Sequence, residues 1–224
     1  MTSLIDEVDN TPDLLTEVGL FQEWSNAYSP DERSSEWECD YPSWPNLYTA
    51  LFIFVTIYPF QSWSSVEVHA VLFTLARDNE SGYIASELRS RFPELLLPLT
   101  QASVASGEPQ ACWQLAEELS WLDPEGGEAE QLLLILARDE NEYVRRRSLR
   151  ALARLGASVV EELALEAWER PDPSQEWARM MVLSCLHQVG SPKLEPLLAV
   201  AEKEERQYLR EYAQKIRRGE VSTH

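Results

Sequence analysis

The chain has 224 residues, of which only 8 are glycine, and a formal net charge of −19 at pH 7. A chain of this length can bury a substantial core as one domain or as a short repeat array. Its negative field repels nucleic acids and anionic membranes, so we expect neither as a partner.

The charge is unevenly distributed along the chain. Residues 1–137 contain 23 acidic and 4 basic side chains, whereas residues 138–224 contain 15 of each. An acidic field of this kind attracts a basic protein surface and speeds encounter with it, although solubility alone is an equal explanation. The distribution predicts that a protein partner, if it is recognised by charge, meets the N-terminal part.

Cysteine usage and hydropathy indicate a cytoplasmic protein. Cys39, Cys112 and Cys185 are widely separated and odd in number, which is typical of reduced, buried thiols. The acidic N-terminus does not resemble an export signal, and the most apolar run, 50–60, is too short to span a bilayer.

The first 64 residues predict an atypical helical cap. After an acidic tail over 1–11, apolar spacing predicts a helix over about 12–27. Residues 46–58 are apolar nearly all round, which predicts a buried helix; their β-branched and aromatic content leaves a strand as the alternative. Pro59 ends this element.

Between these two elements, residues 29–45 form a long acidic loop. Three prolines exclude a long helix here, and the segment also contains five acidic residues, two tryptophans and a tyrosine. Aromatic rings can anchor a partner while carboxylates steer a basic one, although the tryptophans could equally plug the end of the fold. The candidate partner-binding residues of this loop are Glu36, Trp37, Glu38, Asp40, Tyr41 and Trp44.

From residue 65 to 218 the pattern predicts about five helical hairpins, followed by a disordered tail over 219–224. Within 131–156 two amphipathic helices flank a short turn, Asp139-Glu140-Asn141, and Gly156 closes the second helix. The helices expected in this part are 66–77, 93–105, 109–122, 127–138, 141–155, 159–170, 174–189, 192–203 and 205–218.

A stretch similar to 131–156 occurs a second time further along the chain. A shift of 34 positions places Tyr143 on Trp177, Arg145 on Arg179 and Gly156 on Gly190, and Asp139 matches Asp172 with one residue of slip. The tetrapeptide Leu-Ala-Arg-Asp occurs at 75–78 and again at 136–139. A helix pair that repeats with a period of thirty-odd residues is typical of a solenoid.

These residues resemble HEAT repeats, particularly the short bacterial HEAT-like type. The resemblance implies that Asp139 and Arg145, and likewise Asp172 and Arg179, connect successive units, and that the protein binds other proteins. The fold expected is all-α: a short right-handed α-solenoid of about five HEAT-like hairpins with an atypical N-terminal helical cap and a long acidic loop.

Arginines cluster in the helix expected at 141–155. Arg146 and Arg150 point away from its apolar face, which makes them candidates for contact with a partner's acidic patch or with phosphate. The structural alternative is pairing with Glu140, Glu142 and acidic residues of neighbouring helices. A single basic helix in a strongly negative chain argues against nucleic acid.

No catalytic, metal or cofactor constellation is recognisable. His69, His187 and His224 are scattered, and Cys185 and His187 are two residues apart, on different faces of a helix. We therefore expect a non-enzyme without metal or cofactor.

The leading functional hypothesis is an immunity protein, a cytoplasmic antitoxin that is monomeric when unbound and occludes the active site of a basic bacterial toxin domain. A bilin lyase or isomerase of the HEAT-like kind and a scaffold within a larger assembly are the alternatives. Whether the concave groove or the N-terminal loop binds the partner stays open.

Overall fold

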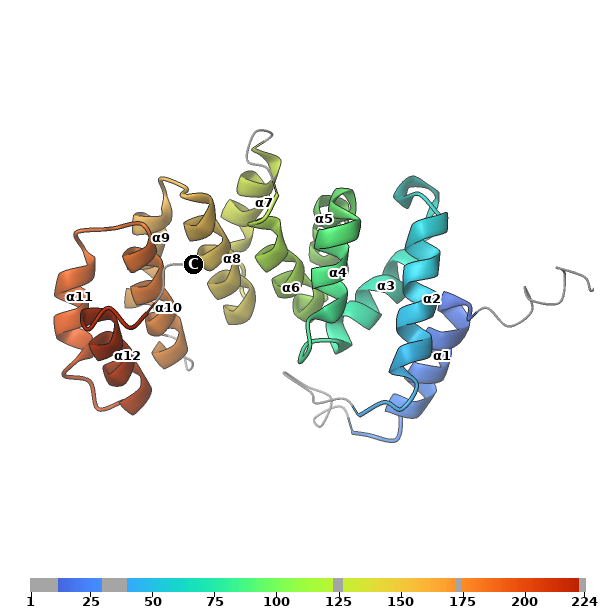
Figure 1. Ribbon diagram of the computed structural model, residues 1–224, viewed down its shortest axis with the longest axis horizontal. Coiled ribbons are helices and arrows are strands. Elements are labelled where there is room, and N and C mark those ends of the chain that lie inside the picture. Colours follow the sequence, from blue (N-terminus) through green and yellow to red (C-terminus); the bar gives the residue numbers. More distant parts are fainter. Residues whose placement is uncertain (1–11, 30–39, 123–126, 172–174, 222–224) are drawn as a thin grey trace, which may run out of the picture. The chain divides into compact units, whose positions relative to one another are not determined.

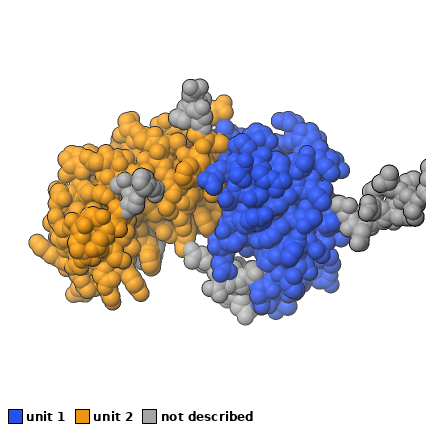
Figure 2. Space-filling model, viewed as in Figure 1, with its two compact units in different colours: residues 1–112 blue, residues 113–224 orange. Residues whose placement is uncertain are grey.

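The computed structural model describes residues 12–29, 40–122, 127–171 and 175–221. The chain divides into two compact units, residues 1–112 and 113–224 (Figure 2). Within the described ranges every regular element is a helix (Figure 1). The all-α fold class predicted from the sequence is therefore confirmed.

Unit 1 begins with two helices that precede the hairpins. The described elements are α1 (Leu14–Ser25), α2 (Trp44–Ile57), η2 (Phe60–Ser62), α3 (Ser65–Arg77), α4 (Tyr83–Arg91), η3 (Pro93–Leu95), α5 (Leu96–Ser106) and the first turn of α6 (Pro109–Leu119). α1 packs against α2 and α3, and α3 packs against α5. The shared core is apolar and aromatic, with Phe21, Leu51 and Leu72 fully buried.

Capping residues explain where these helices begin. The side chain of Asp13 accepts a hydrogen bond from the Thr16 amide at 2.9 Å. Ser64 and Glu67 form a capping box: Ser64 Oγ accepts from the Glu67 amide at 3.3 Å, and Glu67 Oε2 accepts from the Ser64 amide at 2.6 Å. The bonds from Ser64 also lower the pKa of Glu67.

The structure decides between helix and strand for residues 46–58. They are helical, as predicted, but α2 begins at Trp44 and includes Pro45, so the loop expected to extend to residue 45 ends earlier. Proline is tolerated there because the first turn of a helix needs no backbone donor. Residues 30–39 of that loop lie outside the described residues.

Unit 2 is built from α7 (Glu128–Leu136), α8 (Glu142–Leu155), α9 (Val160–Glu169), α10 (Gln175–Gln188), α11 (Leu194–Ala201) and α12 (Gln207–Arg217), after the remainder of α6. The second helices of successive hairpins lie side by side, α8 against α10 and α10 against α12 (Figure 1). This stacking is the arrangement of an α-solenoid.

The turn at 139–141 shows why the repeat pattern takes this form. Asn141 caps α8 by accepting hydrogen bonds from the amides of Tyr143 and Val144, at 3.0 and 3.3 Å. Arg145 donates to the carbonyl oxygens of Asp139 and Glu140, at 2.8 and 2.6 Å. The arginine therefore ties the turn of its own hairpin to the start of the second helix.

The equivalent arginine of the next hairpin reaches further. Arg179 Nη1 lies 2.5 Å from Glu204 Oε1, in the turn that follows α11. Arg210, one hairpin later, again donates to its own turn, to the carbonyls of Glu204 and Glu205 at 2.9 and 3.4 Å. This third copy was not recognised in the sequence. Asp172, the expected partner in the series, lies outside the described residues.

The predicted domain division stays a prediction. The cap of 1–64 and the first two hairpins of the array expected at 65–218 lie mainly in unit 1, and the boundary between the two units falls inside α6. Of the tail expected over 219–224, residues 222–224 lie outside the described residues. Glu220 forms an ion pair with Arg218 at 2.6 Å.

Candidate protein-binding site

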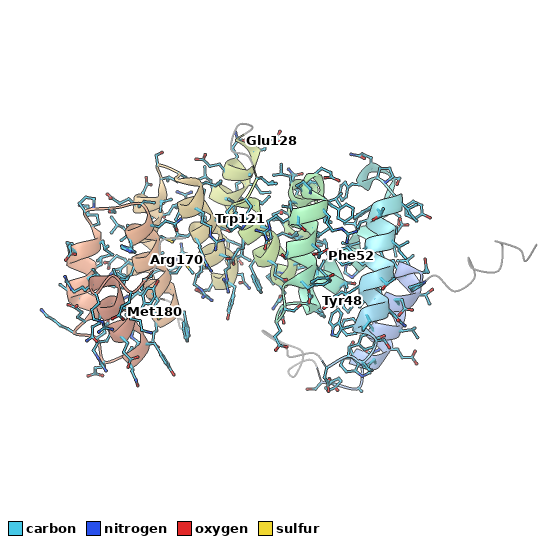
Figure 3. All side chains as sticks on the ribbon, viewed as in Figure 1. Tyr48, Phe52, Trp121, Glu128, Arg170 and Met180 are labelled. Atoms are coloured by element: carbon cyan, nitrogen blue, oxygen red, sulfur yellow. The ribbon has the colours of Figure 1, made fainter. Side chains whose placement is uncertain are left out.

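An open groove of about 490 Å³ lies on unit 1 between α2 and α4. Most of its lining is apolar or aromatic, and Tyr48 and Phe52 from one face of α2 form part of its wall (Figure 3). The lining residues are Tyr48, Thr49, Phe52, Ile53, Thr56, Ile57, Tyr83 and Arg91. A groove of this size and composition is suited to apolar side chains of a partner.

The groove exists because α2 is apolar on two sides and buries only one. Leu47 and Leu51 are fully buried against the rest of unit 1, while Ile57 on the groove side is 61% exposed. The expectation that this helix is buried all round is therefore wrong for half of its surface. Contiguous apolar surface left in water commonly marks an interaction site.

The threonines of the groove present little polarity to it. Thr49 donates its hydroxyl to the carbonyl of Pro45 at 2.7 Å, and Thr56 donates to the carbonyl of Phe52 at 2.6 Å. Because both hydroxyls are bonded to their own helix, they need no hydrogen-bond partner from an incoming ligand. Their methyl groups extend the apolar face of α2.

A buried carboxylate holds the two walls of the groove together. Asp78 accepts hydrogen bonds from the Tyr48 hydroxyl at 2.8 Å, from the Ile84 amide at 2.6 Å, and from the Ser81 hydroxyl. Tyr48 belongs to α2 and Ile84 to α4, so one side chain fixes both helices. Burial raises the pKa of Asp78, and the donated hydrogen bonds oppose that shift.

Aromatic contacts complete the rigid lining. The Tyr83 ring packs edge-on against Tyr48 and Phe52, with centroids 5.0 and 5.8 Å apart. The Arg91 guanidinium lies 5.4 Å from the Phe52 ring centroid and forms an ion pair with Glu87 at 3.2 Å. The groove thus has a mainly apolar and aromatic lining with one charged side chain, Arg91.

Only some of the predicted loop residues lie within the part of the chain that the structure describes. Glu36, Trp37 and Glu38 lie outside the described residues. Asp40 accepts a hydrogen bond from the Tyr28 hydroxyl at 3.4 Å. Partner contact through this loop stays a prediction.

Two of the three aromatic residues of the predicted site, Tyr41 and Trp44, belong to the packing of unit 1. Tyr41 is buried and lies 4.7 Å from Phe21 and 5.2 Å from Trp24, measured between ring centroids. Trp44 stacks on Tyr48 at 5.1 Å, with ring planes 22° apart. Trp44 therefore packs on one of the residues that line the groove, and partner contact through Tyr41 or Trp44 stays a prediction.

The two predicted arginines belong to unit 2 and are engaged in ion pairs. Arg146 Nε lies 2.7 Å from Glu142 Oε1, both side chains are largely buried, and the guanidinium stacks over the Tyr143 ring at 4.4 Å. The adjacent pocket of about 40 Å³ is lined by Glu142, Arg145 and Arg146 among other residues. Arg150 pairs with Glu117 at 3.1 Å.

The repeat pattern of the sequence contains one indication of the groove, the position of Tyr83. When the Leu-Ala-Arg-Asp tetrapeptides at 75–78 and 136–139 are superimposed, Tyr83 falls on Tyr143 with one residue of slip, at the start of a second helix. That position faces the neighbouring second helix in the stacked hairpins of unit 2, where Trp177 and Tyr208 stack at 5.7 Å. In unit 1 the residue at this position, Tyr83, packs against Tyr48 and Phe52 of α2 instead.

Reactive and metal-binding groups are sparse in the described part of the chain. No three His, Cys, Asp or Glu side chains come together there as metal ligands. Cys112 and Cys185 are buried thiols, and burial raises the pKa of Cys185 to about 12. Among the described helices, none is both long and apolar enough to cross a membrane.

The fold defines this chain as a helical repeat protein. Residues 129–216 match the family model described as HEAT repeats, so this part of the chain is made of HEAT-like repeats, as the sequence predicted. A search of curated proteins finds no match. HEAT repeats commonly mediate protein–protein interactions, so the class of function indicated is protein binding.

Proposed function

We propose that this chain is an immunity protein, which binds a basic bacterial toxin domain in the cytoplasm and occludes its active site. One observation carries the proposal: unit 1 combines an open aromatic groove with a large acidic excess. Residues 1–112 contain 17 acidic and 4 basic side chains. Neither feature is needed for the packing of a helical cap alone.

The groove supplies the apolar part of the recognition. An amphipathic helix can place its apolar side chains in a groove between two helices, where a few buried anchors provide most of the affinity. Phe52 and Ile57 offer that contact surface on α2. Because Asp78 and the aromatic contacts hold both walls, little ordering entropy is lost when a partner binds.

The acidic excess of unit 1 favours a partner with a basic surface. Toxins that act on nucleic acids need basic surfaces to hold their substrate, and those surfaces attract an acidic inhibitor. Charge complementarity raises the association rate and disfavours acidic partners. An inhibitor that seats an apolar anchor beside a basic active site blocks access of the substrate without any chemistry of its own.

Two variants at equally exposed positions test whether the groove binds the partner. Ile57 lies in the groove and Val66, on α3, is not among its lining residues, yet each is 61% exposed. The chain is co-expressed with the product of the adjacent open reading frame, and co-purification and growth protection are measured. We expect Ile57→Glu to weaken the complex about tenfold or more and Val66→Glu to leave it unchanged.

Two outcomes would overturn the proposal. If the wild-type chain neither co-purifies with the neighbouring product nor protects cells that express it, the immunity function is wrong. If it instead forms a stable complex with a housekeeping protein and gives no protection, the chain is a scaffold. Equal weakening by both variants would show that the groove is not the contact surface.

A further inference from the structure

Three arginines of α8 converge on one carboxylate of α6 in unit 2. Arg147, Arg150 and Arg154 lie at i, i+3 and i+7, which places them on one face of the helix. Their Nη1 atoms lie 2.8, 3.1 and 3.2 Å from the Glu117 carboxylate oxygens. We refer to these four residues as the arginine cluster.

The cluster carries more positive charge than its internal carboxylate can neutralise. Glu117 forms an ion pair with each of the three arginines, so one carboxylate faces three positive charges. Glu118 also acts electrostatically on Arg154, and the nearby Cys185 thiol is neutral because burial raises its pKa. Burial and the repulsion from Arg150 lower the pKa of Arg154. A second carboxylate from outside would relieve this repulsion.

Two tryptophans of the same region frame the cluster. The Arg147 guanidinium lies 5.1 Å from the Trp113 ring centroid, and the Arg154 guanidinium lies 5.4 Å from that of Trp121. These contacts hold the guanidinium groups in place. Trp121 is 57% exposed and offers an apolar surface next to the charges. Exposed tryptophan beside arginine is the composition of binding hot spots.

The charge of the surroundings selects the kind of ligand. Residues 113–224 contain 21 acidic and 15 basic side chains, so the arginine cluster lies in a unit whose net charge is negative. A nucleic acid needs several phosphate contacts along a basic track, and its backbone would meet repulsion on either side. Clustered carboxylates beside an aromatic side chain fit a compact site, because arginine binds carboxylates through paired, planar hydrogen bonds.

We propose that the arginine cluster, with Trp121, binds an acidic segment of a partner protein, in which carboxylates are adjacent to an aromatic residue. Arg150 is the most exposed of the three arginines and makes the first contact. The incoming carboxylates take up hydrogen-bond donors that Glu117 leaves unused, and the aromatic residue packs on Trp121. This surface is separate from the groove of unit 1 and does not depend on the function proposed for that groove.

The test uses the full chain and a fluorescein-labelled peptide, Glu-Asp-Glu-Phe-Glu-Asp-Glu, with binding followed by fluorescence anisotropy. Arg150→Gln is compared with Arg217→Gln, because the two side chains are 35% and 36% exposed and both pair with glutamate. We expect the first variant to weaken binding about tenfold and the second to leave it unchanged. Glu117→Gln removes the competing carboxylate and should strengthen binding several-fold.

The gain in affinity with Glu117→Gln separates binding from a purely structural role, which would give no gain. The proposal fails if the peptide does not bind the wild-type chain, or if Arg150→Gln and Arg217→Gln behave alike. Tighter binding of an oligothymidylate than of the peptide would assign the surface to nucleic acid. Self-association abolished by Arg150→Gln, measured by analytical ultracentrifugation, would make a second copy of the chain the occupant instead.

Discussion

Two turns of this chain contain the same tetrapeptide, Leu-Ala-Arg-Asp, and their aspartates serve different purposes. In unit 1 Asp78 is buried and accepts hydrogen bonds from α2, from its own turn and from the start of α4. In unit 2 Asp139 is half-buried and accepts from the Asn141 amide at 2.7 Å. The same four letters therefore make a tertiary anchor in one place and a local turn in the other.

The difference arises from what surrounds each turn. In unit 2 the cap of α8 is Asn141 and Arg145 braces the turn carbonyls, so the aspartate is needed only locally. In unit 1 the cap position is Gly82, which has no side chain to offer, and Asp78 supplies the acceptor for α4. A structural role is thus set by neighbours that the tetrapeptide itself does not encode.

The largest expected effect comes from removing the anchor. Asp78→Ala leaves the Tyr48 hydroxyl and the Ile84 amide without their acceptor in a buried site, so we expect a loss of about 2–4 kcal/mol in the free energy of unfolding. Urea denaturation followed by circular dichroism measures it. A loss no larger than that of Asp139→Ala would show that the two turns are equivalent.

Tyr48→Phe removes one bond of the anchor and should cost about 1.5 kcal/mol. Burial first, and then Asp78, raise the pKa of Tyr48 above its ordinary value of 10.0. Because the folded state keeps this proton longer than the unfolded state, the stability it contributes is complete below about pH 10 and is lost as the pH rises further. Wild type should therefore lose stability more steeply above pH 10 than Tyr48→Phe; parallel pH profiles would contradict this.

The cap of α8 gives a smaller effect. Asn141→Ala removes the acceptor for the amides of Tyr143 and Val144 and should cost about 1 kcal/mol. Asn141→Asp serves as the control, since aspartate caps equally well and should retain the stability. Thermal denaturation of both variants measures the loss of stability. Equal destabilisation by the two substitutions would mean that the lost helix cap does not explain the effect.

Asp139→Ala completes the comparison with the smallest loss, about 0.5 kcal/mol, because a half-exposed carboxylate can be replaced by water. Hydrogen exchange of the 139–145 amides measures the effect locally. A loss of several kcal/mol here would imply that Asp139 links successive hairpins, as the resemblance to HEAT repeats implied, rather than its own turn.

The sequence predicted what depends on local order along the chain. Gly156 marks a helix end because left-handed backbone is a local property, and the sequence predicted this end. The apolar composition of α2 favoured a helix but could not show that only one side is covered. That depends on which helices α2 meets, and periodicity does not contain this information.

Long-range pairing accounts for the rest. Tyr48 and Asp78 are 30 positions apart, as are Arg147 and Glu117, and nothing in either pattern names its partner. Pairing of the arginines with Glu142 and with a neighbouring helix was foreseen as the structural alternative, because such acids are abundant. The convergence of three arginines on one glutamate was not, because it requires knowing which acidic residue α6 turns toward α8.

The buried cysteines allow the rate of local opening to be measured separately in each unit. Cys112 lies in unit 1 and Cys185 in unit 2, and both are shielded from water. A thiol reagent attacks only the exposed thiolate, so each site is modified at the rate at which its surroundings open. Site-resolved mass spectrometry of alkylated protein then yields two opening rates from one sample, one for each half of the chain, without an added probe.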